Sequence, residues 1–245
     1  MIELSDLTKK FDTFTAVDHL NLRIETGEFF GLLGPNGAGK TTTISLMSTL
    51  LLPTEGEIRV DGEVLSRKNP RLKRKISVIT QEYSMRQDMT MDEVMEYQGR
   101  LYFMPRKKIR EKTEELTGIL RSDRFSQKDG TQAFRWYEAE LMVCRALLTE
   151  PEILLLDEPT AGFDPVFRKD FTGIIQDIRD REIGVLMSTH IISDIDQIAD
   201  YIMLIDDGEL KFSKTREALG NHSIQELIEQ CGHKKTTVRD LLRRE

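Results

Sequence analysis

A run of glycines, one lysine and two threonines has the residue types and spacing of a phosphate-binding loop. The run is Gly34, Pro35, Asn36, Gly37, Ala38, Gly39, Lys40, Thr41 and Thr42, and it fits G-x-x-x-x-G-K-[ST]. Glycines let backbone N–H groups surround an anion, and a helix after the loop directs its positive end at the same anion. Lys40 adds a point charge for the β and γ phosphates, and the Thr41 hydroxyl suits magnesium. The run predicts a site for a nucleoside triphosphate and Mg²⁺.

The residues on either side of this loop have the pattern that the motif needs. The apolar run 29–33 precedes the loop, and 42–47 continues as a helical pattern. A strand, a glycine loop and a helix in this order present the loop at the end of the strand. The flanking strand and helix therefore argue against a chance match to the motif.

A second group of chemically active residues ends the apolar run 154–156. Asp157 and Glu158 follow this run directly. Buried strands of a parallel sheet are continuously apolar, and ligands bind beyond their carboxyl ends. We therefore expect Asp157 to hold magnesium, directly or through water. Glu158 is expected to polarise the water that attacks the γ phosphate, which requires a base within about 3 Å of the proton.

Strand-like and helical patterns alternate along most of the chain. Strands are expected at 2–4, 16–17, 20–24, 29–33, 57–60, 76–80, 153–157, 185–189 and 201–205, and helices at 107–120, 133–148, 165–179 and 193–199. This alternation predicts an α/β fold with a mainly parallel central sheet. The N-terminal strands predict an antiparallel β subdomain, and Asp61-Gly62 is a hairpin turn signal. The helical block predicts an inserted helical subdomain over about 88–150, in which Thr90 caps a helix.

The composition is that of an ordinary soluble globular protein. Hydrophobic residues make up 39% of the chain and charged residues 31%, and the net charge is −7. This charge gives no indication of nucleic-acid binding. The sequence contains no apolar run near the ~20 residues of a membrane span and no signal-peptide pattern, so we expect a cytosolic chain. Of the two cysteines, Cys144 and Cys231, neither has metal-ligand spacing, and Cys144 is expected to be a small buried hydrophobe.

The order of these motifs resembles that of the ATP-binding subunits of ABC transporters. The resemblance covers about residues 1–220 and leaves 221–245 as a charged helical tail. It implies a P-loop NTPase fold, ATP and Mg²⁺ as ligands, and ATP hydrolysis. It also implies a homodimer or heterodimer with another ATP-binding subunit, and a separate membrane-spanning transporter subunit. The chain would then be cytoplasmic and peripheral at the inner face of the cell membrane, without a nucleic-acid partner.

The resemblance assigns roles to four further segments. Phe11 matches the aromatic residue that stacks on adenine, although a core position at a strand edge is the alternative. Gln81 matches the glutamine that contacts magnesium and the attacking water. His190 matches the switch histidine that contacts the γ phosphate. The run 162–165 matches the loop that crosses the dimer interface, where leucine is more usual than Phe163.

One segment departs from the family pattern. The family has L-S-G-G before a polar helix, and in the ATP-bound dimer this signature closes over the partner's γ phosphate. Counting back without gaps from 144–148 places it on Ala133-Phe134-Arg135-Trp136, which has no serine or glycine. A gapped count places it on Asp129-Gly130-Thr131-Gln132 and lengthens the following helix. We prefer the ungapped count, and either count leaves a degraded signature.

Three interpretations account for the degraded signature. The chain pairs with a different subunit, it binds ATP but hydrolyses it slowly, or the segment was altered from a natural parent. Arg135 either replaces the lost backbone donors with its guanidinium group or lies on a solvated helix face. The residues for the chain's own ATP site are all present, so ATP binding is the firmer expectation.

Three functions compete on these observations. The first is the ATPase subunit of an export-type ABC transporter, with a coupling surface near 81–97 where Met85, Met89, Met91 and Met95 adapt to a partner. For Met91 and Met95, a position in a helix core is the alternative. The second, a soluble ATPase acting on ribosomes or DNA, is disfavoured by the single set of motifs and the negative charge. The third, a poorly hydrolysing or regulatory subunit, is favoured by the degraded signature and opposed by Glu158.

Overall fold

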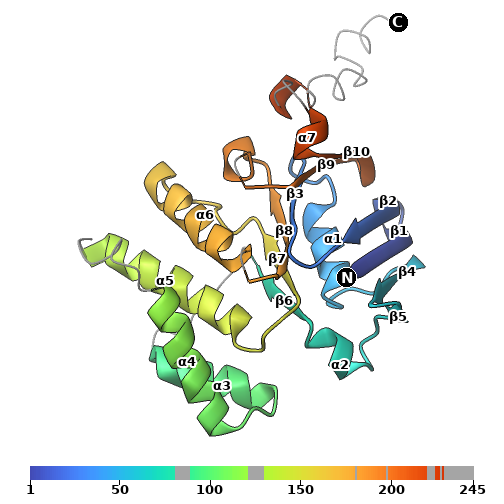
Figure 1. Ribbon diagram of the computed structural model, residues 1–245. Helices are drawn as coiled ribbons and strands as arrows, with labels where there is room; N and C mark the ends of the chain where they lie inside the picture. The colour runs from blue at the N-terminus through green and yellow to red at the C-terminus, as the bar shows by residue number, and fades with distance from the viewer. Residues whose placement is uncertain are drawn as a thin grey trace, which may run out of the picture.

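Two β-sheets and a group of helices make up the described part of the chain (Figure 1). The computed structural model describes residues 1–80, 89–120, 130–179, 181–196, 198–219, 224–226 and 228. Gln81, Met85, Asp129, Cys231 and most of the tail 221–245 lie outside these residues. None of the described helices has the length and apolar character needed to cross a membrane.

The larger sheet has six strands in the order β10-β9-β3-β8-β7-β6. Five of them run parallel, and β10 pairs antiparallel with β9. Every residue of β3, β7 and β8 is buried, which accounts for their largely apolar sequences. The mainly parallel sheet is therefore confirmed. Its strands are β3 (Phe29–Leu33), β6 (Ile76–Ile79), β7 (Ile153–Asp157), β8 (Gly184–Thr189), β9 (Tyr201–Asp206) and β10 (Glu209–Thr215).

The smaller sheet is antiparallel and is formed by the N-terminal third of the chain. Its order is β2-β1-β4-β5, and its strands are β1 (Ile2–Phe11), β2 (Phe14–Ile24), β4 (Glu55–Val60) and β5 (Glu63–Val64). The two short strands expected at 16–17 and 20–24 are parts of the single strand β2. Asp61 and Gly62 both have positive φ and form the predicted turn between β4 and β5.

Three helices, α3, α4 and α5, lie together beside the sheets (Figure 1). Thr90 caps α3 as predicted, because its hydroxyl accepts the Glu93 N–H while the Glu93 carboxylate accepts the Thr90 N–H. The helices are α1 (Lys40–Met47), α2 (Pro70–Lys73), α3 (Met91–Leu101), α4 (Arg106–Leu120), α5 (Gly130–Leu147), α6 (Pro165–Arg179) and α7 (Arg216–Leu219).

Two helix predictions differ from the structure. Helix α5 begins at Gly130, one turn before the expected start at 133. The helix expected at 193–199 is replaced at its start by a short 3₁₀ helix, Ile192–Asp194. The Asp194 carboxylate accepts a hydrogen bond from Thr160, which is distant in the sequence. It accepts another from Thr189, which precedes the 3₁₀ helix. These tertiary contacts are not visible in the local helical pattern.

The hydrophobic core lies on both faces of the parallel sheet. Phe29 and Leu33 of β3 pack with the helices on one face, and Phe30 and Leu32 pack on the other face below the antiparallel sheet. Cys144 is fully buried in the first cluster, so its predicted role as a buried hydrophobe is confirmed. Met91 and Met95 are also buried in this cluster, and they are therefore core residues of α3.

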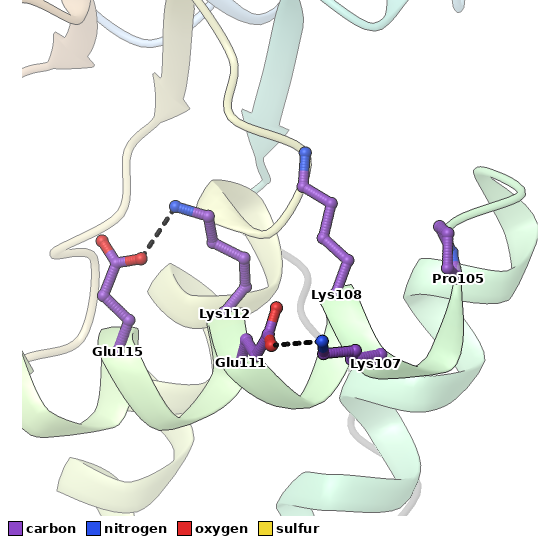
Figure 2. Close-up of a pocket in the computed structure, with 6 residues that line it drawn as sticks. All are labelled: Pro105, Lys107, Lys108, Glu111, Lys112 and Glu115. Atoms are coloured by element: carbon purple, nitrogen blue, oxygen red, sulfur yellow. Dashed lines mark hydrogen bonds and ion pairs between the residues drawn. The ribbon is translucent and has the colours of Figure 1, made fainter.

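Charged side chains line the outer surface of α4 and form a small ionic network (Figure 2). Lys112 contacts Glu115 at 2.8 Å within the helix and Glu150 at 2.9 Å in the segment after α5. Lys108 contacts the same Glu150 carboxylate at 2.7 Å. The hydrogen bonds from Lys108 and Lys112 lower the pKa of Glu150 below its ordinary value. The network thus ties α4 to the segment that leads into β7.

We predict that Glu150→Gln lowers the free energy of unfolding by less than about 1 kcal/mol at neutral pH, because the carboxylate is half-exposed. The pKa of Glu150 is lower in the folded than in the unfolded chain, so its contribution is present above the unfolded value of 4.5. It is lost as the pH falls through the folded pKa. Urea denaturation over this pH range measures the difference between the variant and the wild type.

Glu111→Gln is the matched control, because the one ion pair of Glu111 within the described part of the chain is a long 3.8 Å contact with the exposed Lys107. This control should leave stability unchanged at every pH. A loss for Glu150→Gln that persists after the carboxylate is protonated would contradict the ionic explanation.

Candidate functional site

The site lies where the segments after β3, β8 and β7 converge. These three strands are neighbours in the parallel sheet, so their carboxyl ends meet at one edge. A cavity of about 660 Å³ opens at this edge. It is lined by Phe11, Phe14, Ala16, Asn36, Gly37, Gly39, Lys40, Thr41, Thr42, Glu158, Ala161, Gly162, Arg168, His190 and Ile191. The fold therefore brings most of the predicted site residues into one cavity.

Close packing fixes the shape of the glycine loop. A Cβ atom on Gly34 would lie 2.4 Å from the carbonyl oxygen of Ile205, and one on Gly39 would lie 2.4 Å from that of Ala16. Gly39 also has a φ of 104°, which side chains rarely allow. Gly37 has a positive φ as well, but the space beside it is open. The glycines thus allow the backbone to form a cradle of the kind that binds phosphates.

Lys40 lies across this loop with its ammonium group almost fully buried. Its Nζ donates hydrogen bonds to the carbonyl oxygens of Gly34 at 2.8 Å and Pro35 at 3.0 Å. The same atom lies 3.1 Å from Glu158 Oε1. A buried cation needs such partners, and they hold the charge beside the glycine cradle. This is the position from which an ammonium group can contact terminal phosphates.

Thr41 and Asp157 form the pair that suits a magnesium ion. The Thr41 hydroxyl donates to Asp157 Oδ1 at 3.1 Å, and the Ser188 hydroxyl donates to the same oxygen at 2.7 Å. Hydroxyl and carboxylate oxygens are the hard ligands that Mg²⁺ prefers, with phosphate oxygens and water completing its coordination. Among the residues that the structure describes, no cluster of three or more His, Cys, Asp or Glu could hold a metal ion. The donor set therefore fits magnesium bound together with a phosphate ligand.

Glu158 connects the lysine to the histidine. Its Oε1 faces Lys40, and its Oε2 lies 3.0 Å from His190 Nδ1. Its backbone has a φ of 44°, a strained value for a residue other than glycine. The Glu158 N–H donates to the hydroxyl of Ser188 at 3.1 Å, and this bond helps to hold the strained backbone. The carboxylate is thus fixed at the cavity, in an orientation that suits a general base.

Two phenylalanines line the entrance of the cavity. Phe11 is 42% exposed, so the alternative of a core position is wrong. The Lys9 ammonium lies 5.0 Å from the centre of the Phe11 ring. Phe14 is 60% exposed and pairs with Phe11 across the β1–β2 turn. Sequence reasoning missed Phe14, although a two-residue turn after Phe11 would have placed the two rings on adjacent strands.

The segment after Glu158 is shaped by a turn and a helix cap. Gly162 has a positive φ, and the Asp164 carboxylate accepts the N–H groups of Val166 and Phe167 at the start of α6. The Phe163 ring packs edge-on against Phe167 with ring centres 4.3 Å apart. This contact gives a physical reason for phenylalanine at a position where leucine is more usual.

The degraded signature lies next to the first described residues of α5. The described part of this helix is Gly130–Leu147, and Asp129 lies outside the described residues. The ungapped placement on 133–136 lies within this helix, and the gapped placement begins before its described part. The preference for the ungapped count therefore stays a prediction.

Comparisons with known proteins agree with this site. A family model described as "ABC transporter" matches residues 17–161. The bacitracin transport ATP-binding protein BcrA of Bacillus licheniformis is 33% identical over 86% of this chain and 68% of its own length. The ABC transporter ATP-binding protein NatA of Bacillus subtilis is 33% identical over 89% of this chain and 91% of its own length. A dimeric structure of a bacterial ABC transporter cassette is similar with a TM-score of 0.70, at 26% identity over 88% of this chain and 98% of that one.

We predict that Gly39→Ala raises the Kd for a fluorescent ATP analogue by at least about tenfold, or about 1.4 kcal/mol. A Cβ at this position is strained by the positive φ and meets the Ala16 carbonyl oxygen. Gly37→Ala is the comparison, because it has the same sign of φ but open space beside it. Its effect should be smaller, and equal losses in the two variants would contradict the role of the Ala16 contact.

Proposed function

This chain belongs to the family of ABC transporter ATP-binding subunits, and from this we propose that it hydrolyses Mg-ATP to power a separate membrane subunit of an exporter. The observation that carries the proposal is the contact of Glu158 with both Lys40 and His190 beside the glycine loop. The Lys40 ammonium group, which would bind phosphate, thus lies in contact with the Glu158 carboxylate, which would act as the base. The export type is supported by the names of relatives described as a probable multidrug ABC transporter ATP-binding protein, a daunorubicin resistance ATP-binding protein and a Nod factor export ATP-binding protein.

Each residue of the site has a distinct part in the proposed reaction. Lys40 and the loop N–H groups hold the phosphates, and Thr41 and Asp157 hold Mg²⁺. The magnesium ion neutralises charge on the phosphate oxygens when it is bound. Glu158 accepts the proton of the attacking water, whose oxygen forms the new bond to the γ phosphorus while the bond to ADP breaks. His190 holds Glu158 Oε2 and faces the same end of the cavity.

We infer that Phe11 stacks on the adenine ring and that Phe14 enlarges the aromatic surface against which the base packs. Both rings line the cavity and are accessible to a ligand. Stacking on an exposed ring suits a flat aromatic base. Gln81 follows β6, the strand next to β7, and its proposed role with magnesium rests on the family resemblance.

The proposal includes a dimer of ATP-binding subunits. Gly162 and Asp164 are exposed at the rim of the chain's own site, where they are accessible to a second subunit. The similarity to a dimeric cassette supports this arrangement. Binding of ATP between two subunits would close the dimer, and hydrolysis would reopen it.

We propose that the membrane subunit docks in a groove between the core and the three-helix group. The groove is a cavity of about 500 Å³ with the exposed apolar side chains of Leu50, Leu101 and Phe103, the last being 86% exposed. Its other described lining residues include Arg67, Lys73, Arg74 and Arg145, and none of the described lining residues is an acid. An apolar segment that carries carboxylates would fit this groove. The chain would then lie at the cytoplasmic face of the membrane, without a nucleic-acid partner.

A poorly hydrolysing or regulatory subunit is the alternative. The degraded signature is the observation in its favour. The fixed carboxylate of Glu158 argues against it, because a subunit that does not hydrolyse ATP has no need of a strained and oriented base. We therefore prefer the hydrolysing subunit.

We predict that the purified chain hydrolyses Mg-ATP and that Glu158→Gln lowers kcat by at least about 100-fold, since general-base catalysis contributes about 10²–10⁴-fold. The variant should still bind ATP, because the glycine loop and Lys40 remain. A phosphate-release assay with both proteins measures the difference. Wild-type turnover equal to that of the variant, with ATP still bound, would favour the alternative function or a need for a partner's signature.

A second prediction concerns the partner. Affinity purification of the full chain from detergent extracts of its own cells should co-purify a polytopic membrane protein. Phe103→Ser should weaken this association, because it removes the most exposed apolar side chain of the groove. Phe14→Ser is the control, since Phe14 is also exposed but lies at the nucleotide cavity. Co-purification of ribosomes or DNA in place of a membrane protein would contradict the proposal.

A further inference from the structure

Asp194 is a buried carboxylate behind the nucleotide cavity to which no role has yet been given. Its side chain is 0% exposed. Its Oδ2 accepts hydrogen bonds from Thr160 Oγ1 at 2.5 Å and from Thr189 Oγ1 at 3.3 Å. Burying a carboxylate is costly unless its partners compensate for the lost water. The location of those partners therefore indicates what the buried charge does.

The two threonines belong to the segments that hold the reactive groups. Thr160 is two residues after Glu158, and Thr189 directly precedes His190. These segments follow the neighbouring strands β7 and β8. One carboxylate oxygen thus joins the two segments, and the side chains of Glu158 and His190 lie 3.0 Å apart at the cavity.

The second oxygen of Asp194 faces Arg168. Arg168 Nε lies 3.5 Å from Asp194 Oδ1, close enough for an ion pair, but neither atom has a hydrogen-bond partner among the residues that the structure describes. Arg168 Nη2 donates to the carbonyl oxygen of Phe163 at 3.1 Å, and Arg168 also lines the cavity. The arginine therefore connects the buried carboxylate with the exposed turn 162–164.

We propose that Asp194 is the positioning residue for Glu158 and His190, and that Arg168 links it to the turn 162–164. This rests on the proposed function, because ATP hydrolysis is the reaction that would be positioned. A purely structural role is the alternative explanation. For stability alone, apolar residues in place of a buried ion pair are often as good or better, and two buried atoms without hydrogen bonds do not favour this site. The arrangement instead holds the segments that carry Glu158 and His190 at a fixed separation.

The first test is the variant Asp194→Asn in the full chain. The amide keeps the volume and one acceptor oxygen, but it removes the charge that faces Arg168. We expect kcat for Mg-ATP to fall by about tenfold or more, since small displacements of reactive groups have effects of this size. The Kd for ATP should stay within about twofold of the wild-type value. This separation of turnover from binding would not follow from a general loss of structure.

Asp196→Asn is the matched control. Asp196 lies two residues further along, and its carboxylate contacts Arg216 at 2.7 Å at the surface, away from the cavity. The same acid-to-amide change at this position should leave kcat, Kd and stability unchanged.

A second readout does not depend on hydrolysis. The chain has four histidines, so the ring ¹⁵N signals of His190 can be assigned by NMR with a His190→Gln variant. In the wild type, Glu158→Gln should shift the His190 signal, because their side chains are in contact. In the Asp194→Asn background, this response should fall to less than half. Absence of wild-type turnover would count against hydrolysis by this chain without a partner subunit, whereas the NMR response tests the positioning role separately.

An unchanged kcat together with an unchanged NMR response in Asp194→Asn overturns the proposal. If urea denaturation shows that this variant does not fold, Thr160→Val decides the question. It keeps the side-chain shape and removes the 2.5 Å hydrogen bond to Asp194. We expect the same separation of kcat from Kd and a reduced NMR response. Wild-type values for both would overturn the proposal.

Discussion

The site depends on the adjacency of β3, β8 and β7 in one parallel sheet. Their register aligns Leu33 with Thr189 and Asp157 with Ser188, so the three strands end at the same level. Backbone hydrogen bonds of the buried sheet hold this alignment. Because parallel strands present their carboxyl ends on the same side, the glycine loop, the two acids and His190 have to meet. A shift of β8 by one residue would separate Ser188 from Asp157 and His190 from Glu158.

Among the described residues, three carboxylates lie within or behind this cavity, and each has a different kind of partner. Asp157 accepts from two hydroxyl groups, Glu158 faces a lysine and a histidine, and Asp194 accepts from two threonines and faces an arginine. Hydroxyl donors leave a carboxylate free to bind a cation. Cationic or imidazole partners fix its orientation instead. In the proposed mechanism, the identity of the partner therefore distinguishes the carboxylate that would bind the metal from the one that would accept a proton and the one that would position it.

The group of helices α3, α4 and α5 has a different relation to the site. Its apolar side chains join the core on one face of the parallel sheet, while its charged side chains form surface ion pairs such as that of Lys112 with Glu115 (Figure 2). Exposed apolar residues at its junction with the core remain accessible. The group is therefore fixed to the domain and still offers a surface to a partner. Such a surface is suited to transmit a change at the nucleotide site to another protein.

The sequence by itself determined the glycine loop, the buried strands, the caps and turns, and the family. These features depend on residue types within a few positions, such as the φ that a glycine allows or the burial that an apolar run requires. Only the tertiary structure decided the neighbours of Asp194 and the exposure of Phe11 and Phe14. These depend on contacts between segments far apart in the chain. The segment 193–199 shows where prediction from local sequence fails. Its periodicity predicted a helix, but the buried Asp194 carboxylate bonds to the distant Thr160, and this contact outweighed the local pattern.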